Sequence, residues 1–467
     1  MTPHPALRDA APAVFWLDQP GRPDPAPALT GAHEADLVIV GAGYTGLWAA
    51  LQAHDDHPGR DILVVEAGEA GIGASGRNGG FLAASITHGL ANGLTHFPDE
   101  IDTLQRLGHE NYDALLADLD RHGIDASFRP TGELDVAVAP WQADELPEYA
   151  ELLTRFGEDA VLLDGPATRA AVASPTYLGG VWQRSHVGLV DPGRLVWGLL
   201  AAVRRAGIRV HEHTAVAGIA RARRGSDHVV VHGSHLEVRS RQVVLATNAF
   251  PGLVAPIRRA VLPVYDHVLV TEPLSPSQWS SLGWADGQGL SDSGNQFHYY
   301  RPTPDGRILW GGWDALYHFG NRVSPALEQD DRSQATLATH FFETFPQLDG
   351  VRFTHRWGGP IATTSRFMFT AGRSHGGRVA WAVGYTGLGV GASRFGARVA
   401  LDLLAGDPTE RARLRAVRRR PFPFPPEPAR SAVVAVTRRA LAAADRHDGR
   451  RGPWLKLLDT MGVGFDS

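Results

Sequence analysis

The sequence predicts an α/β fold that begins with a Rossmann-like, doubly wound domain, and three observations support this. Residues 36–40 (DLVIV) are an apolar, β-branched run typical of a buried strand. A G-x-G-x-x-G turn follows at once and leads into an apolar segment that predicts a helix over residues 44–54. A second apolar strand, at residues 62–66, ends in an acidic residue.

The glycine-rich turn predicts a phosphate-binding cradle. Gly41 permits the tight turn, Gly43 lets the backbone approach a pyrophosphate, and Gly46 lets helix and strand pack closely. The helix N-terminus directs its free amides and the positive end of its dipole at the anion. Glu66, at the end of the second strand, is placed to bind ribose hydroxyls. These features predict an adenine dinucleotide site.

Two further glycine-rich segments favour FAD over a nicotinamide dinucleotide. Residues 71–81 (GIGASGRNGGF) provide small residues that let backbone lie against a pyrophosphate and an isoalloxazine ring. Residues 378–406 predict another strand, a glycine-rich turn and a helix, whose N-terminus can stabilise negative charge on reduced flavin. An ordinary loop explains each segment taken alone, but the two together favour FAD.

Length and composition agree with a large enzyme. The 467 residues predict two or three domains. A net charge of −5 gives no general attraction to nucleic acid or to an anionic membrane. No signal peptide and no apolar run of transmembrane length are visible, so we expect a cytoplasmic protein. The absence of cysteine excludes disulfides and a cysteinyl-flavin bond, so FAD is expected to be non-covalent, and no metal site is predicted.

Several motifs resemble one family of flavoproteins. They are GAGYTGLWAA at 41–50, GASGRNGGF at 73–81, and the segments 188–219, 243–250, 297–312, 355–367 and 384–400. Together they are similar to the D-amino-acid oxidase, glycine oxidase and sarcosine oxidase (DAO) family of FAD-dependent oxidoreductases. Within it, the chain looks most like the branch that contains γ-glutamylputrescine oxidoreductase.

The resemblance implies a glutathione-reductase-like FAD-binding domain with an inserted α+β substrate domain built on an antiparallel sheet. The FAD-binding domain would comprise residues 35–95, 186–258 and 355–408, and the substrate domain residues 96–185 and 259–354. Residues 1–34 and 409–467 would be terminal extensions. Phe15 and Trp16 are expected to anchor the first extension. In the second, we expect a helix over residues 431–444 and docking of the terminus through Trp454 and Phe465.

The resemblance also implies the residues that hold FAD. The backbone of Val216 would meet the adenine, and the turn after residue 246 would lie by the dinucleotide. Asn78 either bonds the flavin edge or substrate or is a turn residue. The full predicted set is Gly41, Gly43, Tyr44, Thr45, Gly46, Glu66, Ala67, Ala74, Ser75, Arg77, Asn78, Gly79, Gly80, Val216, Thr247, Asn248, Gly384, Tyr385, Thr386, Gly387, Leu388 and Gly389.

The resemblance implies that the substrate lies between one flavin face and the antiparallel sheet. Alternation puts His298 and Tyr300 on one face of a predicted strand, and Phe297, Tyr299 and Arg301 on the other, without saying which face is inward. The catalytic candidates are a tyrosine and histidine that orient an amine, aromatic rings that enclose its carbon chain, and an arginine for an anionic end. They are Tyr300, His298, Trp313, Trp357, Arg301 and Arg366. The alternative is that the aromatic rings are core and the arginines form surface pairs.

The implied reaction is oxidation of the C–N bond of an amine or N-substituted amino acid, by hydride transfer to flavin N5, giving an imine that hydrolyses. The sequence WGGP at 357–360 departs from the amino-acid oxidase pattern and favours a bulkier or less acidic amine. The family's oxygen-activating lysine would fall at or near Leu309, and Lys456 lies far from it. The electron acceptor is therefore either O2, used modestly, or an unidentified partner.

Two other functions are open alternatives. A flavin monooxygenase of related fold should carry Gly-Asp just before its C-terminal flavin helix, where this chain has Gly384-Tyr385. A flavin-bound scaffold would hold FAD without catalysis. No nucleic-acid partner is expected, because the arginine-rich run at 411–420 lacks interleaved aromatic residues. The oligomeric state is left open.

Overall fold

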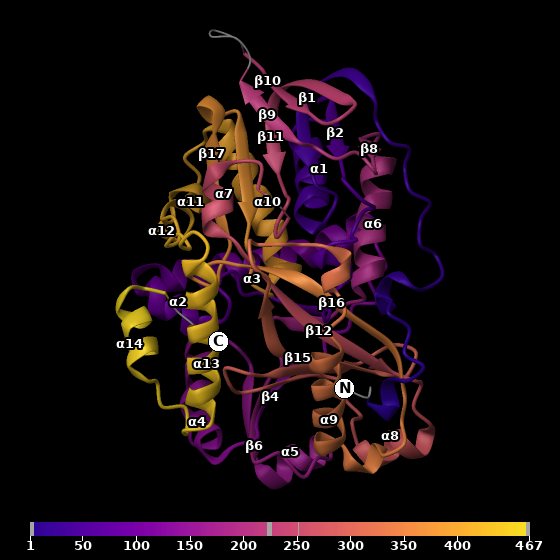
Figure 1. Ribbon diagram of the computed structural model, residues 1–467, viewed down its shortest axis with the longest axis vertical. Helices are drawn as coiled ribbons and strands as arrows, with labels where there is room; N and C mark the ends of the chain where they lie inside the picture. Colours follow the sequence, from indigo (N-terminus) through magenta and orange to yellow (C-terminus); the bar gives the residue numbers. More distant parts are fainter. Residues whose placement is uncertain (1–3, 222–226, 251, 464–467) are drawn as a thin grey trace.

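Two eight-stranded sheets form the frame of the chain (Figure 1). The computed structural model describes residues 4–221, 227–250 and 252–463. A two-stranded sheet of β3 (Phe81–Ala83) and β7 (Val187–Leu189) is separate from both. The predicted α/β class is confirmed.

The first sheet has the order β17-β18-β11-β1-β2-β8. Its parallel strands are β1 (Gly31–Val40), β2 (Ile62–Val65), β8 (Arg209–His211), β11 (Leu236–Leu245) and β18 (Val379–Val383). β17 (Thr370–Ser374) is an antiparallel edge, and β10 (Val229–His232) and β9 (Gly218–Arg221) extend from β11.

Both faces of this first sheet are buried, as its apolar strands require. Along β1, Leu37 and Ile39 enter the core shared with α1 (Tyr44–Asp56), α6 (Pro192–Arg205) and α10 (Gly389–Ala405). Val38 and Val40 enter the core on the other face. The carboxyl ends of β1 and β18 lead into α1 and α10, so both glycine-rich turns meet at one edge of the sheet.

The second sheet has the order β16-β12-β15-β14-β13-β4-β6-β5. Its strands are β16 (Phe353–Thr363), β12 (Leu262–Thr271), β15 (Ile308–Tyr317), β14 (His298–Pro302), β13 (Gly289–Asp292), β4 (Glu133–Ala137), β6 (Gly179–Gln183) and β5 (Ala160–Asp164). All pairs are antiparallel except β13 with β4. Because β16 pairs with β12, residues 355–363 lie in this sheet, although they were predicted for the FAD-binding domain.

One face of the second sheet packs against α9 (Asp331–Thr344) and α8 (Pro276–Leu282), which lie at the bottom of Figure 1. α4 (Pro140–Arg155) and α5 (Gly165–Ala171) pack on β5 and β6 of this sheet, whereas α3 (Ile101–Arg121) packs on α10 in the core of the first sheet. α2 (Leu90–His96) and α7 (Ala255–Ala260) are short connecting helices. No helix in the described part of the chain is both long and apolar enough to cross a membrane.

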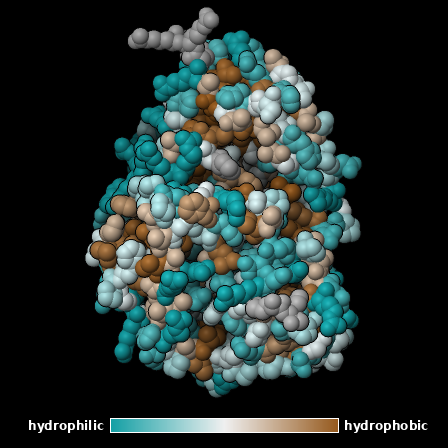
Figure 2. Space-filling model, in the orientation of Figure 1, coloured by the Kyte–Doolittle hydropathy of each residue, from teal (hydrophilic) through white to brown (hydrophobic). Residues whose placement is uncertain are grey.

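The described parts of both terminal extensions contact the body of the protein. Trp16 is fully buried and its Nε1 donates to the Asn78 carbonyl at 2.9 Å, so the predicted N-terminal anchor is confirmed. The C-terminal segment forms α11 (Glu410–Arg413), α12 (Arg415–Arg418), α13 (Ala429–Asp445) and α14 (Pro453–Thr460). Figure 2 shows apolar side chains gathered over α14, where Leu457 and Met461 are exposed. Phe465 lies outside the described residues.

Candidate active site

One long cavity of about 2150 Å³ is lined by both glycine-rich turns, the segment 71–81 and the second sheet. A pocket for one small molecule is usually about 300–1,000 Å³. The cavity is therefore large enough for a dinucleotide together with a substrate. Among the predicted FAD-binding residues, all line it except Gly46 and Gly384.

The first cradle is formed by the turn between β1 and α1. Gly41 has φ +111°, and a Cβ there would lie 2.7 Å from the Ala246 carbonyl oxygen. Gly46 lies behind the cavity, where a Cβ would lie 1.8 Å from the Gly41 carbonyl oxygen. Gly46 therefore acts through the close packing of helix and strand that the sequence predicts.

Glu66 fixes the shape of this cradle. Its carboxylate accepts hydrogen bonds from the backbone amides of Ala42 (2.8 Å) and Gly68 (2.9 Å). Burial raises its pKa, against the lowering effect of those amides. The carboxylate lies in the cavity lining beside Ala67, which is the position predicted for a ribose-binding acid.

The second cradle, residues 71–81, is tied together by its own side chains. Asn78 Nδ2 donates to the carbonyls of Ala74 (3.0 Å) and Ser75 (2.9 Å), and its Oδ1 accepts from the Gly80 amide. This geometry supports the turn-residue alternative for Asn78. Arg77 forms an ion pair with Glu328 at 2.7 Å.

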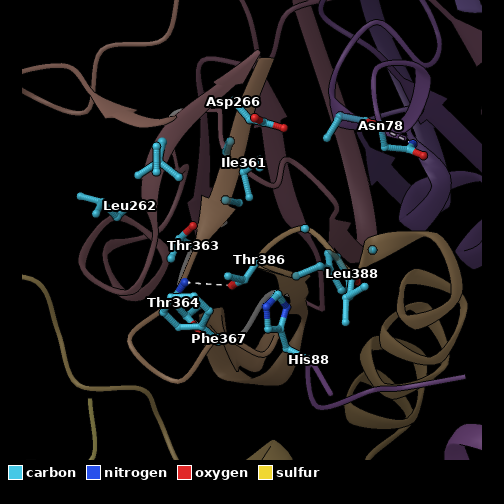
Figure 3. Close-up of a pocket in the computed structure, with 18 of the residues that line it drawn as sticks. Asn78, His88, Leu262, Asp266, Ile361, Thr363, Thr364, Phe367, Thr386 and Leu388 are labelled. Carbon is cyan, nitrogen blue, oxygen red and sulfur yellow. Dashed lines mark hydrogen bonds between the residues drawn. The ribbon is translucent and has the colours of Figure 1, made fainter. Parts of the chain in front are cut away.

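The third cradle joins the end of β18 to α10. Asn248 Oδ1 accepts from the Gly384 amide at 3.0 Å, and Thr45 Oγ1 donates to the Tyr385 hydroxyl at 3.0 Å. Thr386 has φ +51°, and its Oγ1 accepts from the Thr364 amide (Figure 3).

These three cradles fit FAD. Glycines that leave no room for a Cβ let backbone approach a ligand, and the N-termini of α1 and α10 both open on the cavity. The buried Thr247 hydroxyl has no hydrogen-bond partner among the described residues, as expected for a group that faces a bound molecule. The role of each single cradle residue in binding FAD stays a prediction.

His298 and Tyr300 lie on the wrong face of β14 for contact with substrate, which corrects their prediction as catalytic residues. His298 Nδ1 bonds Asp292 at 2.5 Å, and the Tyr300 hydroxyl lies 2.7 Å from that of Tyr177. Neither residue lines the cavity. The reason is that this face of the sheet packs against the apolar side of α9.

The two predicted anion-binding arginines also lie outside the cavity lining. Arg301 is fully buried and donates to the carbonyls of Val190 (2.6 Å) and Gly80 (3.3 Å), so it braces the second cradle. The Arg366 guanidinium lies over the Phe97 ring and finds no hydrogen-bond partner among the described residues. The structure thus gives Arg301 a bracing contact in place of the predicted one, whereas the role of the buried Arg366 guanidinium toward an anion stays a prediction.

Trp313 and Trp357 do line the cavity, and their roles there stay predictions. Trp357 Nε1 donates to the Arg77 carbonyl at 3.1 Å, which ties β16 to the second cradle. Trp313 has φ +71°, a strained value for a non-glycine residue, and its ring stacks on His298. Leu309, the predicted position of the family lysine, is buried outside the lining.

The inward face of the sheet presents Tyr299 and Asp266, which sequence reasoning did not select. The Tyr299 hydroxyl donates to Asp266 Oδ2 at 2.6 Å. The Tyr299 ring fits between Gly79 and Gly311, where added Cβ atoms would lie 2.7 and 2.6 Å from it. In Figure 3, Asp266 and Asn78 lie at one end of this part of the cavity, and Thr386, Leu388 and His88 at the other.

Asp266 reaches the cavity because β12 carries a bulge between Tyr265 and His267. Bulges re-aim a side chain and are common beside active sites. Burial raises the pKa of Asp266 to about 6, while hydrogen bonds from Tyr299 and backbone amides act to lower it. The available sequence signal was an acidic residue, followed by a histidine, inside a mostly apolar strand, VYDHVLV.

A second pair of carboxylates lines the same sheet face. Ser291 Oγ lies within hydrogen-bond distance of both Glu133 (3.0 Å) and Asp135 (2.6 Å). Burial and their mutual repulsion raise the pKa of Glu133. Within the described residues, neither carboxylate has an ion-pair partner.

Three residues could hold a metal ion, although none was predicted. The ligand atoms of His109, Glu158 and His186 lie within 4.8 Å of one another. The two imidazole rings stack with centroids 3.8 Å apart, and each bonds a different oxygen of Glu158 (2.7 and 2.9 Å). Parallel rings direct their nitrogen atoms side by side rather than at one point, so we assign a hydrogen-bonded ion cluster.

Three main-chain cradles on one cavity, facing a sheet that carries a buried acid and a tyrosine, define an FAD-dependent oxidoreductase. Comparison with known proteins gives the family. Residues 36–403 match the DAO family, described as FAD dependent oxidoreductases, and the chain belongs to it. The predicted family and cofactor are thus confirmed.

Relatives with known names lie in several branches of that family. The chain is 33% identical to γ-glutamylputrescine oxidoreductase of Escherichia coli (strain K12), over 82% of this chain and 86% of that one. It is 25% identical to sarcosine oxidase subunit beta of Rhizobium meliloti (strain 1021), over 74% of this chain and 76% of that one. The fold is that of glycine oxidase from Geobacillus kaustophilus (TM-score 0.66, 20% identity, covering 81% of this chain and 96% of that chain).

Proposed function

We propose that the protein oxidises the C–N bond of an amine that carries no carboxylate next to the reacting carbon. The observation that carries this proposal is the charge of the sheet face opposite the cradles. Asp266, Glu133 and Asp135 line this sheet face, whereas Arg301 and Arg366 do not line the cavity. Burial raises the pKa of Glu133 to about 8, so the proposal depends chiefly on Asp266. The arginines that do line the cavity belong to the second cradle, α7 and the C-terminal segment, and are Arg77, Arg259, Arg430, Arg438 and Arg451. A cationic amine is favoured there over a simple α-amino acid. The named relatives that act on amines or on sarcosine support the same reaction class.

Asp266 is proposed to accept a proton from the bound ammonium. An amine must be neutral before its α-carbon can give up a hydride, and a carboxylate with a pKa near 6 is ionised at neutral pH. Tyr299 would orient that carboxylate through its hydroxyl. Bound FAD would supply the hydride acceptor. Trp313 and Trp357 would enclose the carbon chain and exclude water.

An anaerobic screen tests this proposal. The purified holoenzyme is mixed with primary, secondary and N-methyl amines, and with α-amino acids as matched carboxylated compounds. Loss of flavin absorbance with amines, and aldehyde or dealkylated products identified by mass, are expected. Bleaching by α-amino acids alone would contradict the proposal. Oxidation of NADPH without any amine would instead favour a monooxygenase.

The electron acceptor is inferred from the side chains around the cavity. No lysine lines it in the described part of the chain, and Lys456 is exposed on α14. We therefore infer slow reoxidation by O2 and transfer to another acceptor. Rapid mixing of the reduced enzyme with oxygenated buffer measures this directly, and fast reoxidation would favour an oxidase. We also propose that the protein is located in the cytoplasm.

A further inference from the structure

We propose that the C-terminal helices α13 and α14 form the outer wall of the substrate cavity and set the length of the amine chain that is accepted. The proposal rests on the proposed function, since it concerns that same substrate. Both helices lie beyond residues 36–403, which match the family. They therefore lie outside the part of the chain that the family model matches. In Figure 1, α13 runs down one side of the molecule towards α4.

One face of α13 is turned to the cavity. The residues on that face recur at helical spacing and are Arg430, Val433, Val434, Thr437, Arg438 and Leu441. Val436, on the opposite face, does not line the cavity and is 43% exposed. The apolar part of this face, Val433, Val434 and Leu441, suits a hydrocarbon chain.

Half-buried, hydrogen-bonded carboxylates fix both ends of α13. At the N-terminal end, Glu427 accepts from the Tyr317 hydroxyl, from the Gly320 amide (2.9 Å) and from Ser431 Oγ (2.8 Å). At the C-terminal end, Asp445 accepts from Asn295 Nδ2 (2.6 Å) and the Gln296 amide (2.9 Å). Apart from Ser431, which is in α13 itself, these partners belong to the end of β15, the loop after it and the loop before β14, so α13 is tied to the sheet at both ends.

The wall continues into α14 and α4. Trp454 Nε1 donates to Thr437 Oγ1 at 2.9 Å, and Trp454 also lines the cavity. A Cβ on Gly449 would lie 2.9 Å from the ring of Trp141, a lining residue of α4. This part of the cavity is therefore lined by side chains of the C-terminal segment and of α4, with apolar residues such as Trp141, Trp454 and Leu458 among arginines such as Arg438 and Arg451. Only an extended substrate would reach them.

Two matched substitutions on α13 test the role in specificity. Val434→Trp fills the cavity from the wall, whereas Val436→Trp adds the same ring to the solvent side. Val434→Trp should lower kcat/KM for n-decylamine by about tenfold or more and leave n-butylamine within about twofold. Val436→Trp should leave both amines unchanged. Equal losses for both amines, or equal effects of the two variants, would overturn the proposal.

Cysteine labelling tests the wall without relying on turnover, because the natural chain contains no cysteine. In the holoenzyme, Val434→Cys should react with a neutral maleimide about tenfold more slowly than Val436→Cys, and n-decylamine should slow only the former. Equal labelling rates, or no protection by n-decylamine, would overturn the proposal. If n-decylamine protects Val434→Cys while no amine bleaches the flavin, the wall stands and the proposed reaction fails.

Discussion

Among single residues, Asp266 is the one on which the proposed proton transfer depends. Its carboxyl is neutral below a pKa of about 6 and ionised above it, so proton acceptance is lost as the pH falls. We predict that kcat/KM for an amine declines below about pH 6. In Asp266→Asn, this decline should be absent, and kcat/KM at neutral pH should be about 100-fold lower than in the natural protein. Steady-state kinetics from pH 5 to 9 check this, on the scale of side-chain pKa values.

Tyr299→Phe is the matched control for Asp266. The Tyr299 hydroxyl lowers the pKa of Asp266 by donating to its carboxylate, so removing it should move the acid limb to higher pH without abolishing it. An unchanged limb in both variants would exclude Asp266 as the proton acceptor.

The choice between the two faces of β14 shows the limit of sequence reasoning at this scale. A period of two correctly separated His298 and Tyr300 from Phe297, Tyr299 and Arg301. The inward face was decided by α9, which covers His298 and Tyr300 on the other face of the strand. The contacting residues of α9, such as His340, lie about 40 residues further along the chain. Local pattern contains no information about that partner.

A pH-dependent contribution to stability is expected from Glu158. Burial raises the pKa of this carboxyl, but hydrogen bonds from His109, His186 and Ser185 outweigh that and hold it at about 2, against 4.5 unperturbed. The stabilisation, on the order of 3 kcal/mol, is present above about pH 4.5 and lost as the pH falls towards 2. The hydrogen bond with Glu158 raises the pKa of His186 above 6.5. The stabilisation from this pair is therefore fully present below about pH 6.5 and is lost as the pH rises through the raised pKa.

Urea unfolding across a pH series tests the Glu158 cluster. Glu158→Gln should be destabilised most between about pH 4.5 and 6.5, where both contributions are present. Glu151→Gln, on the exposed side of α4, is the control and should follow the natural protein. A Glu158→Gln penalty that does not vary with pH would contradict the assigned ion cluster.

At the scale of elements, the first βαβ unit depends on close packing of α1 on its turn. Gly46→Ala would place a methyl group 1.8 Å from the Gly41 carbonyl oxygen, so the helix must shift and the cradle widen. We predict loss of bound FAD and a fall in Tm. Gly59→Ala, which has nothing within 4 Å, should retain both. The ratio of flavin to protein absorbance and a thermal melt provide the measurement.

Elements with a local signal were predictable. The capped helix α6, in which Asp191 accepts from the Arg194 amide, and the turn before α1 both follow from nearby residues. The β12 bulge and the pairing of β16 with β12 depend on partners distant in sequence. They decide the placement of Asp266 and Trp357, which explains why the cradles were predicted better than the substrate face.

At the scale of the whole molecule, the cavity exists because two sheets meet and the C-terminal helices close over them. The cradles bring backbone amides to one side, and the second sheet brings carboxylates and aromatic rings to the other. The sequence indicated both halves separately. It did not indicate that residues 429–460 form part of the wall, because their helical pattern is also that of an ordinary surface helix.

The central claim is that a hydride from the α-carbon of an amine reduces the flavin in this cavity. Anaerobic stopped-flow mixing of holoenzyme with an amine and with its α-deuterated form measures it most directly. The account predicts that flavin absorbance is lost in both cases, and that deuterium slows this loss severalfold. No bleaching by any amine, or equal rates for the two forms under conditions where bleaching limits the rate, would contradict it.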